Sequence, residues 1–238
     1  MVKKMKKSDI KVLPIFLIIL VFFTGLTYYM TNQSNQSKIE NLESRYNSEI
    51  ETLSTQINDI QTQLEEKNQE LEMIQNFMGT YFKAMNHLYL AWIAKVNAEY
   101  YYDLASWSYD NNYLQDTIDY CVQARSYYLD ASQKFKNSEA LFKKANNTAP
   151  NEHYIYLSTS YVGLTDSGSK LMTYMYEACE YFESASLKYL QYYDTGNEEI
   201  YEIANSELEE MNKRIEKHDK EVDIYNDYLA EINAILET

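Results

Sequence analysis

The sequence predicts an all-α protein with an N-terminal transmembrane helix, a coiled-coil stalk and an up-down four-helix bundle. The 238 residues include only 5 Gly and 2 Pro, too few for a β protein, whose turns recur about every 8–12 residues. An uncharged run occupies residues 12–30. Beyond it, apolar residues recur in steps of three and four, the spacing of helices that pack along one side.

Residues 12–30 are predicted to cross a membrane. Their length, at about 1.5 Å per residue, spans a hydrocarbon core of about 30 Å. Five lysines lie in the basic tip, residues 1–11, so the positive-inside rule places the N-terminus in the cytoplasm and the C-terminal domain outside the cell membrane. A cleaved signal peptide is the alternative, although the run is long for one and Gly25-Leu26-Thr27 is a poor cleavage site.

A polar linker, residues 31–37, leads into a predicted stalk, residues 38–75. The stalk has a heptad seam in which Lys67 occupies one core position. An apolar seam without a partner in its own chain predicts a homo-oligomer. The seam begins at Tyr46 and continues through Ile50, Leu53, Ile57, Ile60, Leu64, Leu71 and Ile74.

Residues 76–238 are predicted to form the bundle from four helices. The first continues from the stalk, from about Lys38 to Tyr109, and turns at Asp110, Asn147 and Gly196 separate it from three more. Thr165 to Ser169 is interpreted as a close helix contact at Gly168 rather than a loop. The first helix has the predicted inward seam Met85, Tyr89, Ile93, Val96, Tyr100, Leu104 and Trp107. The second has Leu114, Thr117, Cys121, Ala124, Tyr128, Ala131, Phe135, Ser138, Phe142 and Ala145. The third has Tyr154, Leu157, Tyr161, Leu164, Gly168, Leu171, Met175, Ala178, Phe182, Ala185, Tyr189 and Tyr192. The fourth has Ala204, Leu208, Met211, Ile215, His218, Val222, Tyr225, Leu229, Ile232 and Leu236.

Two cysteines lie at equal distances from the turn at Pro150. Cys121 precedes it by 29 residues and Cys179 follows it by 29, so an antiparallel hairpin holds both at one height. A disulfide outside the cell is one interpretation, and two buried free thiols are the other.

Composition excludes several classes of function. The net charge is −15, and residues 1–30 carry five Lys and one Asp, which leaves −19 on the remainder. Nucleic-acid binding is therefore not expected. No nucleotide-binding, nucleophile-elbow or zinc-helix motif occurs, and His87, His153 and His218 lack metal-ligand spacing. We expect no enzyme activity, cofactor or metal site.

Tyrosine is abundant, with 25 copies, several of them adjacent. Adjacent residues cannot share one helix seam, so some rings must lie at boundaries or at the surface, where they suit binding of a protein or glycan. Glycosylation sequons begin at Asn32, Asn35 and Asn146.

Residues 98–124 resemble one tetratricopeptide helix pair. Tyr101, Leu104, Ala105, Ile118 and Ala124 occupy positions at which that repeat favours an aromatic, Leu, a small residue, Ile and Ala. Thr117 and Cys121 depart from the pattern, and no second copy follows. The resemblance implies a protein-binding module and no specific site residues.

These observations predict a membrane-anchored extracytoplasmic scaffold or binding module. A structural envelope spacer without a specific ligand and a ligand-sensing ectodomain are the alternatives. An exposed tyrosine surface would favour binding, whereas rings buried throughout would favour the spacer. Because the bundle is expected to cover its own seams, oligomerisation is expected to depend on the stalk.

The lysine asymmetry predicts the topology. Protease added to intact cells should remove the C-terminal domain and leave a short anchor fragment, because residues 31–238 are expected outside. Full protection of the C-terminal region would contradict this orientation.

Overall fold

The computed structural model describes residues 18–22 and 36–237, with side chains from residue 43 onward in the second range. Four long helices follow one another: α2 is Gln36–Asp110, α3 is Leu114–Asn146, α4 is Glu152–Thr195 and α5 is Glu198–Leu236. Ile18–Phe22 is also helical. All regular structure within these ranges is α-helical, which confirms the all-α part of the predicted fold class.

The chain divides into two compact units, Met1–Glu66 and Lys67–Thr238. In the first unit, residues 36–66 belong to α2, and the side chains described from residue 43 are exposed apart from a half-buried Ile57. The second unit holds the remainder of α2 together with α3, α4 and α5. It contains the hydrophobic core.

The helices of the second unit end at the predicted turns. Asn112 adopts a left-handed conformation, with φ 60°, in the turn between α2 and α3. Asn151 caps α4 by accepting a hydrogen bond from the Tyr154 backbone N–H at 3.2 Å. Gly196 ends α4 with φ 66°, where a side chain would be strained. Asn197 then caps α5.

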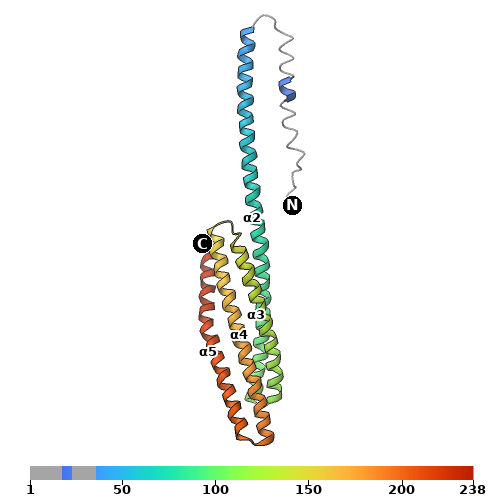
Figure 1. Ribbon diagram of the computed structural model, residues 1–238, viewed down its shortest axis with the longest axis vertical. Helices are drawn as coiled ribbons and strands as arrows, with labels where there is room; N and C mark the ends of the chain where they lie inside the picture. Colours follow the sequence, from blue (N-terminus) through green and yellow to red (C-terminus); the bar gives the residue numbers. More distant parts are fainter. Residues whose placement is uncertain (1–17, 23–35, 238) are drawn as a thin grey trace. The chain divides into compact units, whose positions relative to one another are not determined.

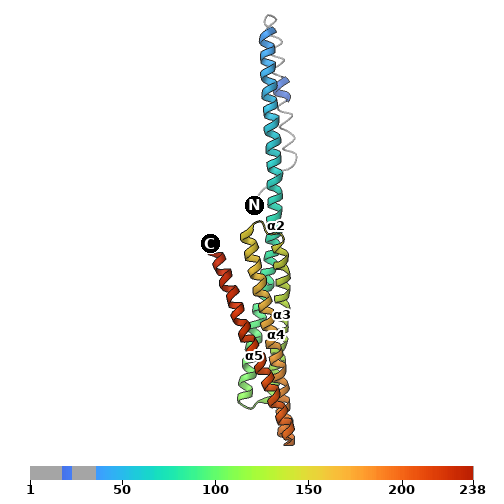
Figure 2. The same cartoon turned by 60° about the vertical axis from the view of Figure 1, so that its left-hand side comes forward.

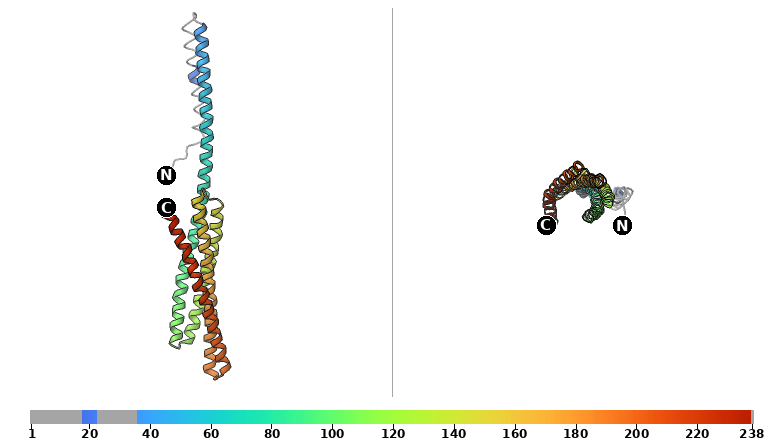
Figure 3. Two further views of the ribbon diagram at one scale, coloured as in Figure 1. Left: turned by 90° about the vertical axis from the view of Figure 1, so that its left-hand side faces the viewer. Right: turned by 90° about the horizontal axis from the view of Figure 1, so that it is seen from below.

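The four helices of the second unit alternate in direction and form a helical bundle (Figure 1). Both α3 and α5 pack against α4, and an end-on view shows α3, α4 and α5 along an arc (Figure 3). Helix α2 contacts all three. Its Ala84 carbonyl accepts a hydrogen bond from Ser138 Oγ of α3 at 2.8 Å. Its rings meet α4 and α5 at Tyr81–Tyr161 and Trp92–Tyr225.

The predicted seams of α3 and α4 are confirmed. All ten positions of the α3 seam are buried, and so are ten of the α4 seam, with Tyr154 and Tyr192 half-buried. Helix α4 runs unbroken through Thr165 to Ser169. A Cβ atom at Gly168 would lie 2.6 Å from the ring of Phe135, so this glycine permits the close contact between α3 and α4.

The predicted seam of α2 within the bundle is wrong. The side of α2 that enters the core consists of Phe77, Ala84, Ala91, Ala98 and Ala105, spaced seven residues apart and at most 1% exposed. Leu88, Ala94 and Ser108 are also buried on this helix. The predicted residues Tyr89, Ile93, Val96, Tyr100 and Trp107 are exposed instead, whereas Met85 and Leu104 are half-buried. The side with small side chains is the buried one, because small side chains let α2 approach its neighbours closely.

Helix α5 is less buried than α3 or α4. Of its predicted seam only Ala204, Tyr225 and Ile232 are buried, Leu236 is exposed and the remaining positions are half-buried. Helix α5 is inclined to α4 (Figure 2). Its contacts with α4 include Ser167 Oγ, which donates to the Glu221 carbonyl at 3.4 Å, and an Arg214–Glu177 ion pair at 3.0 Å.

No helix in the described ranges is both long and apolar enough to cross a membrane. The predicted transmembrane segment, residues 12–30, lies outside the described residues except for Ile18–Phe22.

Two glycines offer a matched test of the packing. Gly168→Ala should destabilise the bundle by about 1–3 kcal/mol, because the fully buried Phe135 ring cannot move aside easily. Gly79→Ala should stabilise it by about 0.5–1 kcal/mol, because nothing lies within 4 Å of a Cβ there and alanine is the better helix former. Thermal unfolding followed by circular dichroism measures both, and equal shifts would contradict the close contact.

Candidate interaction surface

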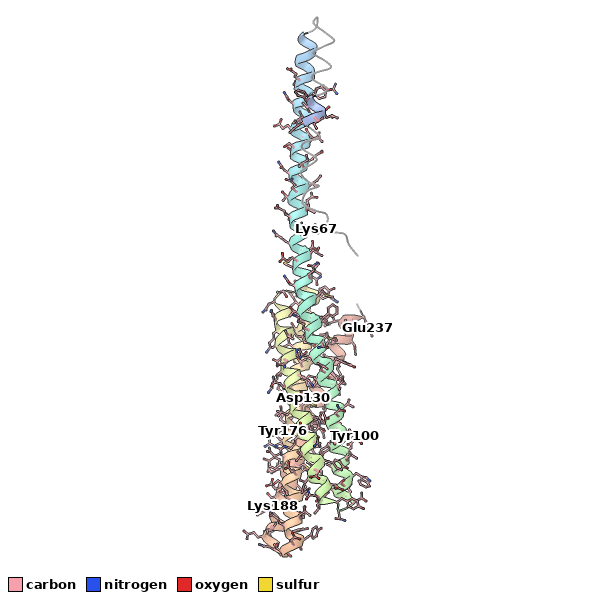
Figure 4. All side chains as sticks on the ribbon, turned by 90° about the vertical axis from the view of Figure 1, so that its right-hand side faces the viewer. Lys67, Tyr100, Asp130, Tyr176, Lys188 and Glu237 are labelled. Atoms are coloured by element: carbon pink, nitrogen blue, oxygen red, sulfur yellow. The ribbon has the colours of Figure 1, made fainter. Side chains whose placement is uncertain are left out.

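A row of large apolar side chains lies exposed on the bundle part of α2. We call it the α2 stripe, and its members are 42% to 64% exposed. Figure 4 labels one of them, Tyr100, on α2. Such a continuous exposed apolar surface is typical of an interaction site rather than of a solvated helix. The α2 stripe consists of Phe82, Tyr89, Ile93, Val96, Tyr100 and Trp107.

Helix geometry explains why these residues share one side. Their separations of seven, four, three, four and seven residues keep them within one sector of a helix with about 3.6 residues per turn. The alanines of the buried side occupy the opposite sector. Two opposite apolar sides of one helix cannot both enter the core. The alanine side, which packs more tightly, is the one that does.

The α2 stripe is almost free of charge in a chain that is 24% charged. Between Phe82 and Trp107, the three-residue steps that it skips fall on Met85 and Asp103, and the four-residue steps fall on Asn86 and Leu104. Lys95 and Glu99 lie beside it and pair with each other at 2.5 Å. The surface thus offers aromatic and aliphatic contact with one carboxylate.

The predicted oligomer seam of the stalk is also exposed. In the first unit Ile50, Leu53, Ile60 and Leu64 are exposed, and Ile57 is half-buried. In the second unit Leu71 and Ile74 are exposed. Lys67 pairs with Glu70 at 2.6 Å, and its side chain is 76% exposed.

Cys121 and Cys179 are both free and fully buried. They lie near Tyr102 in the layer where α2, α3 and α4 meet, as the equal-height argument predicts. Burial raises the pKa of Cys121 to about 12, with a further contribution from Glu183 and a smaller opposing one from Arg125. Burial likewise raises the pKa of Cys179. Both groups are therefore unreactive thiols at neutral pH, and a bridge between them stays a prediction.

Arg125 is a cross-link that the sequence analysis missed. Its guanidinium, on α3, donates to three side chains of α4: Glu183 at 2.6 Å, Glu180 at 3.1 Å and the Tyr176 hydroxyl at 3.0 Å. It also stacks on the Tyr176 ring at 4.9 Å. Burial lowers the pKa of Arg125, but the hydrogen bonds of Tyr176 and Glu183 outweigh it, so the pKa is raised and the charge is fixed.

Tyrosines occupy both core and boundary positions. Tyr128 is buried, whereas Tyr101 and Tyr127 are half-buried and stack across α2 and α3 at 5.6 Å, nearly parallel. Tyr89 and Tyr100 lie outside on the α2 stripe. The rings are therefore not buried throughout, which is the observation expected of a binding surface.

The other predicted residues are dispersed. Asn146 is the last residue of α3 and its side-chain oxygen is buried, whereas Asn32 and Asn35 lie outside the described residues. His218 contacts Asp219 at 3.1 Å, and His87 and His153 lie on α2 and α4. In the described ranges no group of three His, Cys, Asp or Glu side chains could hold a metal ion.

Residues 98–124 comprise the end of α2, the turn and the start of α3, with Ala105, Thr117, Ile118, Cys121 and Ala124 all buried. Comparison of the chain with protein-family models and with curated proteins finds no match. The tetratricopeptide resemblance stays a prediction.

Thiol reactivity tests the environment of the two cysteines. With pKa values raised by burial, both should resist alkylation in the folded chain at pH 8 and react after unfolding without reductant. Leu129→Cys, at a position that is 58% exposed, supplies a reactive control. If the native thiols react after unfolding only when a reductant is present, they form the alternative, a disulfide.

Proposed function

We propose that this chain is a membrane-anchored helical scaffold that assembles with further copies through its stalk and presents a binding surface outside the cell. One observation carries the proposal: apolar side chains lie exposed along α2, both in the stalk seam and on the α2 stripe. Apolar surface left in water is unfavourable by about 25 cal/mol per Å². Another molecule must therefore cover these surfaces.

The anchor is supported by residues 12–30, which are uncharged and follow a lysine-rich tip. Ile18–Phe22, the part of this segment that the structure describes, is helical and its five apolar side chains are exposed. The lysines favour a cytoplasmic N-terminus, and the acidic remainder then stands off an anionic membrane surface.

A binding role is favoured over a spacer by the character of the α2 stripe. A spacer needs only a solvated exterior, whereas the stripe exposes four aromatic rings: Phe82, Tyr89, Tyr100 and Trp107. Aromatic side chains of this kind dominate the energetics of protein interfaces. The absence of any convergent catalytic constellation in the sequence gives no support to an enzyme.

Charge in the stalk seam tests assembly. In the full chain, Ile57→Asp with Ile60→Asp should weaken the oligomer, because both copies would place carboxylates in one apolar seam. Asn58→Asp with Thr62→Asp adds the same charge on the outer side of the same turns and should leave the oligomer intact. Sedimentation in detergent measures the state, and circular dichroism checks that both variants stay helical. A monomeric unmodified chain would contradict stalk assembly.

A further inference from the structure

The α2 stripe lies within the second unit, so the stalk cannot account for it. The sequence predicts a bundle that covers its own seams, which would leave self-association to the stalk. The bundle instead exposes six large apolar side chains on one side of one helix. We propose that this side is covered by the same side of a second, parallel copy of this chain, an inference that rests on the anchored scaffold proposed above.

The exposed area is large enough for a specific interface. Large apolar and aromatic side chains have about 150–250 Å² to bury, so six of them at these exposures leave on the order of 600–800 Å² per copy. Two copies would bury on the order of 1,200–1,600 Å², which lies within the range of stable protein interfaces. A small ligand or single peptide side chain would leave most of the stripe uncovered.

Spacing favours a helix as the occupant. The stripe follows the three- and four-residue steps that bring side chains to one edge of a helix, so a second helix running alongside can meet every member. The same steps recur earlier along α2, through Leu71, Ile74 and Met78. A parallel copy of α2 has the matching spacing throughout, whereas an unrelated helix would match it only by coincidence.

Charge favours a second copy of this chain as the molecule that provides this helix. Residues 31–238 carry −19, so two copies repel each other along most of their surfaces. On the α2 stripe this repulsion is small, because Asp103 is its one charged position. That carboxylate lies near the end of the stripe, where water and salt screen it. The proposed anchor also holds neighbouring copies parallel and at one height.

Cysteine cross-linking in the intact membrane tests this inference on the full chain. Two populations with different tags would each carry Val96→Cys, and a mild oxidant would join thiols of adjacent copies. Leu129→Cys on α3 is the matched control, since the two positions are 59% and 58% exposed. The native thiols are fully buried, and the unmodified chain therefore measures the background rate of cross-linking. We expect product containing both tags to form at least about tenfold faster for Val96→Cys, because pairing raises the local thiol concentration.

Ile60→Cys in the stalk separates this inference from the proposed assembly. Cross-linking at Ile60 without cross-linking at Val96 would keep the stalk oligomer and overturn the stripe interface. Cross-linking at Val96 alone would keep the stripe interface and overturn the stalk seam. Equal rates at Val96 and Leu129 would indicate random collision and overturn the inference. So would a Val96 product that contains another protein in place of the second tag.

Orientation is tested by Phe82→Cys, near one end of the stripe. In a parallel pair Phe82 faces its own counterpart, so this variant should also yield a product with both tags. In an antiparallel pair it would face the region of Trp107, and mixing Phe82→Cys with Trp107→Cys copies would be needed for a product. The latter result would overturn the parallel arrangement.

Discussion

The architecture of the bundle depends on the close approach of α2 to its neighbours. Its buried side presents one phenylalanine and then alanine at every seventh position from Ala84 to Ala105. Ser138 of α3 therefore reaches the backbone carbonyl of Ala84 directly, at 2.8 Å. Alanine supplies little core volume, so the large rings come from the facing helices, chiefly Tyr128, Phe135 and Phe142. Because the tightly packed side of α2 is small, its large apolar residues are left on the outside.

The same constraint explains what could and could not be predicted from the sequence. In α3 and α4 every position that the three- and four-residue steps mark is buried or half-buried, although α4 buries eight further residues, Met172 and Cys179 among them. Helix α2 has two periodic sides, one with alanine and one with Tyr89, Ile93, Val96 and Tyr100. Hydrophobicity favours the second, but packing favours the first, and the choice depends on the rings that α3 and α4 supply. Gly168 was predictable because its seam continued through it, and the Phe135 ring above it shows why no larger residue fits.

Polar contacts fix the alignment that apolar packing leaves loose. Ser132 meets Ser169 at 3.0 Å between α3 and α4, and Arg125 joins three side chains along almost two turns of α4. A helix shifted by one turn would break these bonds and leave a half-buried guanidinium without its carboxylates, which is costly. Nothing local marks Arg125, because its partners lie 51 to 58 residues further along the chain. This explains why sequence periodicity identifies the seams of α3 and α4 and not the cross-link between them.

Surface charge and the alanine side of α2 act together under the proposed assembly. A strongly acidic domain resists association in general. At physiological salt this repulsion acts between charges within about 8 Å of each other and is largely screened beyond that distance. Copies tethered in one membrane would then meet along a side with few carboxylates, the α2 stripe, which carries the apolar rings. The repulsion elsewhere adds specificity rather than affinity, since it opposes pairing in other orientations. Alanine at every seventh position of α2 thus closes the bundle on one side and leaves, on the other, an apolar side with one charged position, Asp103.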